Sequence, residues 1–154
     1  MKRQLKSFRN AFKGIFSAFA TEGHLRFHLV AAFFVLLFAY ISEMNSSQWG
    51  ILLVSIGLVF AAELFNTAIE LLCDLYTKDF NPIIGRIKDI AAGAVLFSAI
   101  CAAGVALALF VFTGKLFYAF ERLIANPIYF LPLGICAVCA FLFVLMGGRK
   151  TKKK

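Results

Sequence analysis

The chain has 154 residues, of which 62% are hydrophobic and 16% aromatic, and it carries a formal net charge of +8 at pH 7. This apolar content exceeds that of an ordinary soluble domain and predicts an integral membrane protein. The length leaves room for three or four spanning helices of about 20 residues each, which excludes a separate soluble catalytic domain. The positive charge does not indicate nucleic-acid binding, because the basic residues flank apolar runs and form no aromatic-laced soluble patch.

Residues 2–20 predict an amphipathic helix on an anionic, cytoplasmic membrane surface. Apolar side chains recur there at steps of three and four, and basic side chains occupy the other positions, Lys2, Arg3, Lys6, Arg9 and Lys13. No continuous apolar core and no small-residue cleavage site precedes Glu22. We therefore expect this segment to stay in the mature protein.

Two apolar segments follow the surface helix. The first span is expected at about 25–42 and enters from the cytoplasm, with Arg26 snorkelling to the surface. Residues 43–48 contain no Lys or Arg, as is typical of an outer loop. The second span, at about 49–73, then returns to the cytoplasmic side.

The remaining chain predicts an inner loop and two further apolar helices. Residues 75–88 combine charges with Pro82 and Gly85, which is typical of an inner loop, and a span rich in small residues follows at about 89–113. Residues 127–147 predict a fourth transmembrane helix, and a basic tail ends the chain at 149–154. The positive-inside rule places this tail in the cytoplasm together with the N-terminus.

We therefore expect an all-α membrane protein in two parts. Residues 1–115 hold the amphipathic surface helix and a core of three spans. Residues 116–154 add an interfacial linker, the fourth transmembrane helix and the basic tail.

A polar stripe marks the second span. Glu63, Asn66, Glu70 and Asp74 lie at offsets of 0, 3, 7 and 11, which return to nearly one face of a helix. A carboxylate in a bilayer is costly unless it has a partner, and it usually marks function. Glu63 lies about 16 Å along the helix from Asp74. An acid near the surface can hold a divalent cation, and a deeper acid can accept a proton from a lipid hydroxyl.

Charged residues from other segments are expected at the depth of this stripe. Arg86, Lys88 and Asp89 begin the third span, and Glu22 lies at the level of the basic surface helix. The combination suits phosphoryl transfer, which needs positioning, neutralisation of phosphate charge and a base for the attacking hydroxyl. The sequence has no Walker loop and no protein-kinase motif, so any kinase here is of another type.

Other interpretations of the stripe stay open at this point. Its residues could hold a helix bundle together, with Asp89 as a helix N-cap and Lys88 as a topology charge. Alternatively, the chain could be a proton-coupled small membrane transporter subunit in which Glu63 and Glu70 take up and release protons. A transporter would have no need of the basic residues beside the stripe.

Two smaller patterns have both a functional and a structural interpretation. His24 and His28 are four residues apart and could bind a metal with Glu22, but interfacial histidines are the favoured interpretation. Cys136 and Cys139 form a CxxC pattern without a second pair, which favours packing over metal or redox chemistry.

Four motifs of the chain resemble those of the small prokaryotic diacylglycerol kinase and undecaprenol kinase family. The two long motifs are Glu63-x-x-Asn66-Thr67-Ala68-Ile69-Glu70-x-x-x-Asp74 and Gly85-Arg86-x-Lys88-Asp89-x-Ala91-Ala92-Gly93-Ala94-Val95. The shorter ones are Phe8-x-x-Ala11-Phe12-x-Gly14 and Glu22-x-x-x-Arg26-x-His28. The resemblance covers residues 1–115. It implies a multi-pass, homotrimeric lipid kinase of the bacterial cytoplasmic (inner) membrane, which uses Mg²⁺ and ATP and shares its sites between protomers.

The resemblance also implies roles for individual residues. Glu63 matches the catalytic base and, with Ala92, would contact the lipid, while Glu22 and Glu70 match two carboxylates that hold Mg²⁺-ATP. Asn66 and Asp74 would support them. Nucleotide contacts would come from three segments, through Arg3, Asn10, Asp79, Phe80, Asn81, Arg86, Lys88 and Asp89.

Two features of the resemblance bear on specificity. The family often has Tyr at Asn10 and Tyr-His at Phe80-Asn81, so the contacts to the nucleotide base differ here. Diacylglycerol and undecaprenol both present one hydroxyl on a long apolar tail, and both fit as the lipid.

Overall fold

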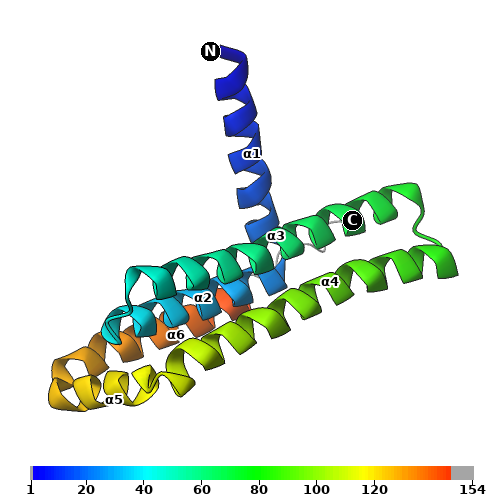
Figure 1. Cartoon of the computed structure of the whole chain (residues 1–154). Helices are drawn as coiled ribbons and strands as arrows, with labels where there is room; N and C mark the ends of the chain where they lie inside the picture. The colour runs from blue at the N-terminus through cyan, green and yellow to red at the C-terminus, as the bar shows by residue number, and fades with distance from the viewer. Residues whose placement is uncertain (1, 147–154) are drawn as a thin grey trace.

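The structure is a computed structural model that describes residues 2–146, and all regular elements in that range are helical (Figure 1). The predicted all-α class is confirmed, whereas the predicted basic tail lies outside the described residues. In chain order the elements are α1 Lys2–Thr21, α2 Gly23–Ile41, α3 Ser46–Tyr76, α4 Pro82–Leu107, the π-helical turn η1 Ala108–Phe112, α5 Lys115–Ala125, the short turn η2 Pro127–Tyr129 and α6 Phe130–Met146.

Three helical segments are long and apolar enough to cross a membrane. They are α2 with 19 residues, α3 with 31, and α4 continued by η1 with 31. Figure 1 shows α3 and α4 running side by side along most of their lengths, with α2 beside the first half of α3. These segments confirm the predicted three-span core.

The predicted fourth apolar segment forms α6, which packs against α2. Its 17 residues correspond to a length of about 26 Å at 1.5 Å per residue, near the lower limit for a helix that crosses a bilayer. The helix is confirmed, and its passage through the membrane stays a prediction.

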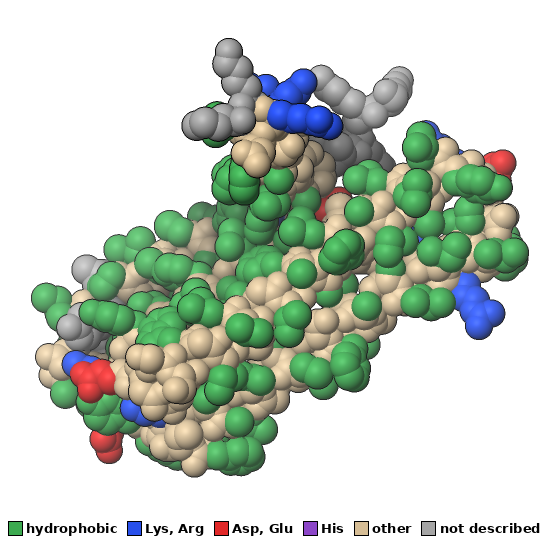
Figure 2. Space-filling view, turned by 45° about the horizontal axis from the view of Figure 1, so that its top comes forward, with side chains coloured by type: hydrophobic (Ala, Val, Ile, Leu, Met, Phe, Trp, Pro, Cys, Tyr) green, Lys and Arg blue, Asp and Glu red, His purple; other side chains and the backbone are tan. Residues whose placement is uncertain are grey.

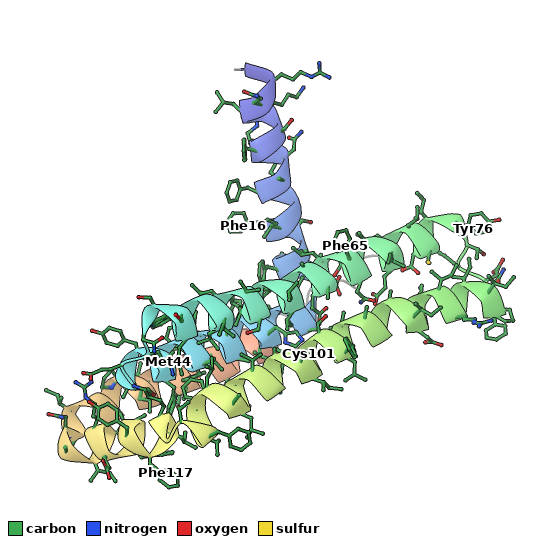
Figure 3. The ribbon with its side chains drawn as sticks, in the orientation of Figure 1. Phe16, Met44, Phe65, Tyr76, Cys101 and Phe117 are labelled. Carbon is green, nitrogen blue, oxygen red and sulfur yellow. The ribbon has the colours of Figure 1, made fainter. Side chains whose placement is uncertain are left out.

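Helix α1 stands away from the other helices and crosses their direction (Figure 1). Leu5, Phe8, Phe12 and Phe16 are all exposed on it, and the side chain of Phe16 projects from α1 in Figure 3. A basic helix with an exposed apolar stripe is suited to lie flat on a membrane surface. The long apolar helices that run across α1 are then oriented to cross the bilayer.

The corner between α1 and α2 depends on a buried arginine. Arg26 is only 3% exposed, so the expectation that it snorkels to the membrane surface is wrong. Its Nη1 donates to the carbonyl oxygens of Phe19 at 3.2 Å and Ala20 at 3.0 Å. These carbonyls end α1 and lack helical partners, so the guanidinium folds back and caps them. The rings of Phe19 and Phe60, 5.9 Å apart, join the same corner to α3.

The loop between α3 and α4 is shorter than the sequence predicts. It comprises only 77–81, whereas the predicted loop runs from 75 to 88. Asn81 is the N-cap of α4, since its Oδ1 accepts hydrogen bonds from the N–H groups of Ile83 at 2.9 Å and Ile84 at 3.3 Å. Pro82 occupies the first turn, where a missing N–H costs no helical hydrogen bond.

This earlier start of α4 changes the setting of three predicted site residues. Arg86, Lys88 and Asp89 lie on the helix and not in or next to a loop. The alternative that Asp89 is an N-cap is wrong, because Asn81 holds that position. The sequence pattern misleads here because Pro82 marks a turn and a helix start equally well.

At the other end of the bundle, a polar cluster ties the α2–α3 loop to α5. Glu43, which has a φ of 51°, pairs with Arg122 and accepts a hydrogen bond from the Tyr118 hydroxyl at 2.9 Å. Lys115 Nζ donates to the carbonyl oxygens of Ser42 at 2.9 Å and Glu43 at 3.0 Å. We call Glu43, Lys115, Tyr118 and Arg122 the outer latch, because they lie at the end of the bundle away from the α3–α4 loop.

The electrostatics of the outer latch give it a defined pH dependence. The hydrogen bond from Tyr118 and the charge of Arg122 lower the pKa of Glu43 below its ordinary value of 4.5, and the same hydrogen bond raises the pKa of Tyr118. A carboxyl group whose pKa is lowered in the folded state stabilises the fold above its unfolded pKa. That contribution disappears as the pH falls through the lowered pKa.

We predict that Glu43→Gln lowers the thermal midpoint in detergent at pH 7, because the ionised carboxylate is lost from the latch. The deficit relative to the wild type should shrink as the pH falls below the ordinary carboxyl pKa. Glu121→Gln on α5 is the matched control, since Glu121 is exposed and forms no ion pair within residues 2–146. An unchanged deficit at acidic pH would contradict the electrostatic role.

Candidate functional site

The predicted polar stripe lies on a single helix, α3, and its members differ in burial. Glu63 is buried, Asn66 and Glu70 are half-buried, and Asp74 is exposed. Figure 3 shows Phe65 on the side of α3 turned away from α4, as its two-residue offset from Glu63 requires. The buried and half-buried part of the stripe therefore faces the neighbouring helices, whereas Asp74 at its end is open to the surroundings.

The buried end of the stripe contacts α2. Glu63 is 5% exposed, and its Oε1 lies 3.1 Å from Nε2 of His28, whose side chain is 21% exposed. The sequence interpretation of His28 as an interfacial residue misses this contact. A usable signal was its spacing from Arg26, because two residues on a helix point about 200° apart. With Arg26 turned toward α1, His28 had to point the opposite way.

The middle of the stripe contains an internal hydrogen bond and an unused acceptor. Asn66 Nδ2 donates to Glu70 Oε1 at 2.8 Å, one helical turn apart. Within the described part of the chain, Asn66 Oδ1 is buried and has no hydrogen-bond partner. Buried polar atoms normally have partners, so this oxygen is a candidate ligand-binding atom.

The exposed end of the stripe joins α3 to α4 through the ion pair of Asp74 with Lys88. This pair lies at a pocket of about 450 Å³ formed by the α3–α4 loop and the adjoining helix ends. Six of the predicted nucleotide-binding residues line the pocket, namely Asp79, Phe80, Asn81, Arg86, Lys88 and Asp89. The structure thus gathers them into one charged surface.

A second pocket, of about 310 Å³, lies between α2, α3 and α4. Its wall is almost entirely apolar, with four alanines contributed by α4, and His28 is part of it. The imidazole that contacts Glu63 therefore also borders an apolar groove. Along α3 the groove ends at Phe60, one turn before Glu63.

Other predicted site residues lie apart from these pockets. Arg3 and Asn10 are on the outer part of α1, which stands away from α3 and α4 in Figure 1, and Glu22 is the half-buried residue between α1 and α2. Ala92 is exposed on α4. One protomer does not bring Arg3, Asn10 or Ala92 to the groove or the charged pocket.

The structure describes no metal-binding cluster within residues 2–146. Among residues 2–146 no three His, Cys, Asp or Glu side chains form a group that could hold a metal ion. Neither the Glu22 and Glu70 set nor the alternative set of His24, His28 and Glu22 makes such a cluster. Cys136 and Cys139 are free thiols on α6.

The space-filling view shows how charge is distributed around the bundle. Figure 2 shows hydrophobic side chains over most of the visible face, with charged side chains gathered at the N-terminal part of α1 and at the two ends of the bundle. The charged α3–α4 pocket and the outer latch occupy those opposite ends. This distribution suits helices whose middles contact lipid or other protein.

Comparisons with known proteins agree on one family. The model of the prokaryotic diacylglycerol kinase family matches residues 9–110, ending within η1. The undecaprenol kinase of Bacillus subtilis (strain 168) is 38% identical over 110 residues, which cover 71% of this chain and 89% of that protein. No solved structure matches the chain.

Two relatives named diacylglycerol kinase are also similar to the chain. That of Synechocystis is 36% identical over 99 residues, covering 64% of this chain and 57% of that protein. That of Escherichia coli (strain K12) is 29% identical over 100 residues, covering 65% of this chain and 82% of that protein.

We predict that the Asp74–Lys88 pair stabilises the fold only slightly, because the Lys88 side chain is 36% exposed and the Asp74 side chain 60%. A double-mutant cycle with Asp74→Asn and Lys88→Met should give a coupling energy close to zero in detergent unfolding, as is usual for exposed ion pairs. The control cycle replaces Lys88→Met by Arg86→Met, because Arg86 lines the same pocket without an ion pair to Asp74. A coupling energy clearly larger than that of the control cycle would contradict this prediction.

Proposed function

Because this chain belongs to the prokaryotic diacylglycerol kinase family, we propose that it is a membrane lipid kinase that transfers the γ-phosphate of ATP to a lipid hydroxyl. The relatives named above are undecaprenol and diacylglycerol kinases, and both alcohols carry one hydroxyl on an apolar tail. The proposed reaction forms a bond between the lipid oxygen and the γ-phosphorus, breaks the bond to ADP, and needs a base to take the hydroxyl proton.

The observation that carries this proposal is the position of Glu63 between two pockets of opposite character. On α3, the apolar groove ends at Phe60 and the charged pocket begins at Asp74, so Glu63 lies between them. A lipid tail fits the first surface and a triphosphate fits the second, which contains Arg86 and Lys88. A carboxylate between them suits a base for a hydroxyl that arrives from the lipid side.

Glu63 is the proposed general base. It is the buried acid of the stripe, and the groove that ends one turn before it is lined by apolar side chains apart from His28 and Ser55. Such a position excludes bulk water from the hydroxyl that is to be phosphorylated, which favours transfer to lipid over hydrolysis. Ala92, exposed on α4, is proposed to contact the lipid.

Glu70 and Asn66 support a role for Mg²⁺. Mg²⁺ prefers oxygen ligands, and the stripe offers the Glu70 carboxylate and the unpartnered Asn66 Oδ1 next to it. When bound, Mg²⁺ would neutralise phosphate charge. We propose Glu22 as the further carboxylate and Asp74 as a support, with the nucleotide held by the charged pocket and by Arg3 and Asn10.

The arrangement of one protomer supports a shared site. Arg3 and Asn10 lie on a helix that points away from the charged pocket of their own chain (Figure 1). In a homotrimer, α1 of a neighbour could bring such residues to that pocket. We propose this assembly in the bacterial cytoplasmic membrane, with α6 as a fourth span and both termini in the cytoplasm.

One observation also favours a proton-coupled transporter, namely a buried Glu63 in contact with a titratable imidazole. Transporters use such intramembrane acids to take up and release protons. They have no need of a charged pocket with Arg86 and Lys88. Binding of Mg²⁺-ATP to the purified protein distinguishes the two functions.

The test is phosphorylation by purified protein in mixed micelles, with diacylglycerol and undecaprenol supplied in parallel. We predict Mg²⁺-dependent and ATP-dependent transfer to at least one lipid, and a fall in kcat of about 10²–10⁴-fold in Glu63→Gln, because a positioned base contributes that much. ATP binding should be retained. Glu121→Gln is the control, because it removes a charge from an exposed position of α5. Lack of transfer to either lipid by a folded protein would refute the proposal.

For Glu70→Gln we predict a different defect. Removing a carboxylate ligand should raise the Mg²⁺ concentration for half-maximal activity about tenfold or more, because Gln is a weaker ligand for a hard cation. Activity at saturating Mg²⁺ should partly recover, unlike that of Glu63→Gln. The measurement is a Mg²⁺ titration at fixed ATP, and an unchanged midpoint would remove Glu70 from the proposed metal site.

A further inference from the structure

His28 is the one polar partner of Glu63 in the described part of the chain. Its Nε2 lies 3.1 Å from Glu63 Oε1, and within residues 2–146 Glu63 forms no other ion pair and no side-chain hydrogen bond. We propose that His28 is a positioning residue that holds Oε1 through an Nε2–H donor and leaves Oε2 free for the lipid hydroxyl. This inference rests on the proposed function, in which Glu63 is the base.

The other basic side chains near this level form no ion pair with Glu63 within residues 2–146. Arg26 caps the last carbonyls of α1 through Nη1, and its buried Nε and Nη2 have no hydrogen-bond partner in that range, while Lys88 pairs with Asp74 at the far end of the stripe. A carboxylate in an apolar bundle needs a donor to offset its desolvation. The His28 ring nitrogen is the group placed to supply that donor from α2, at an Nε2–Oε1 distance of 3.1 Å, on a helix whose start is anchored by Arg26.

The imidazole is itself restrained. The ring of Phe27 lies 5.8 Å from the ring of His28 in an edge-on arrangement, and the ring of His28 borders the apolar groove. An imidazole turns about two side-chain torsions and a Glu side chain about three, so the stiffer His28 ring can define the orientation of the Glu63 side chain. Preorganisation of this kind lowers the barrier to transfer without a new chemical group.

The division of tasks in the reaction follows from this geometry. As the lipid oxygen bonds to the γ-phosphorus and ADP leaves, the hydroxyl proton passes to Oε2 of Glu63. His28 keeps its Nε2 proton throughout, so it is neither an acid nor a base in this step. Its loss should therefore affect the transition state for transfer and not the binding of nucleotide.

Kinetics of His28 variants test this role. His28→Ala should lower kcat about 10- to 100-fold, with the KM for ATP changed by less than about twofold, because a charge-assisted hydrogen bond is lost near the reacting atoms. His28→Gln places an amide N–H at the reach of Nε2 and should recover most of the lost kcat. His24→Ala, which changes the exposed histidine one turn earlier on α2, should behave as the wild type.

Nuclear magnetic resonance tests the contact without any assay of activity. The chain has 2 histidines, so a sample labelled with ¹⁵N only in histidine gives two sets of ring signals, and His24→Ala assigns them. Glu63→Gln should shift the ring signals of His28 and leave those of His24 in place. Unshifted signals of His28 would show that the contact is absent and would overturn the proposal.

The outcomes separate this inference from the proposed function. If the wild-type protein transfers phosphate and His28→Ala keeps full kcat, the positioning role is refuted and the kinase function stands. If His28→Gln is as slow as His28→Ala although both are folded oligomers by gel filtration, the donor role is refuted. A wild-type protein that phosphorylates no lipid refutes the proposed function and the positioning role together.

Discussion

A carboxylate inside an apolar helix bundle must be paired, and this requirement organises the part of the molecule where α1, α2 and α3 meet. Glu63 lies on α3 where apolar residues precede it, and it is matched by His28 from α2. For His28 to face α3, α2 must enter the bundle in a fixed rotation. Arg26 sets that rotation by capping α1 on the opposite side of α2. The surface helix, the first span and the acidic stripe are thus held in one arrangement by two polar contacts.

The two ends of the bundle use polar groups differently. At the α3–α4 loop, Asn81 caps α4 and the Asp74–Lys88 pair crosses between the helices, which leaves an open, charged pocket. At the opposite end, the outer latch connects the α2–α3 loop to α5 next to the main cluster of buried apolar side chains. The first end is therefore suited to binding a charged ligand, and the second to holding the helices together.

The outer latch also explains how the last part of the chain is attached. The family match ends within η1, yet α5 and α6 are not a separate unit, since Arg122 and Tyr118 of α5 bind Glu43 and α6 packs on α2. A pocket of about 400 Å³ remains between α2, α5 and α6. The addition therefore packs against α2, and none of its described residues line the apolar groove or the charged pocket.

The sequence alone determined the helical class, the three long apolar segments and the common face of Glu63, Asn66, Glu70 and Asp74, because hydrophobicity and helical periodicity are local properties. It did not determine where α4 begins, because Pro82 serves a turn and a first helical turn equally. Only the tertiary structure decided that Arg26 is buried and that His28 meets Glu63, since both depend on how α2 packs against α1 and α3. Contacts between helices arise from their mutual rotation, which no single segment encodes.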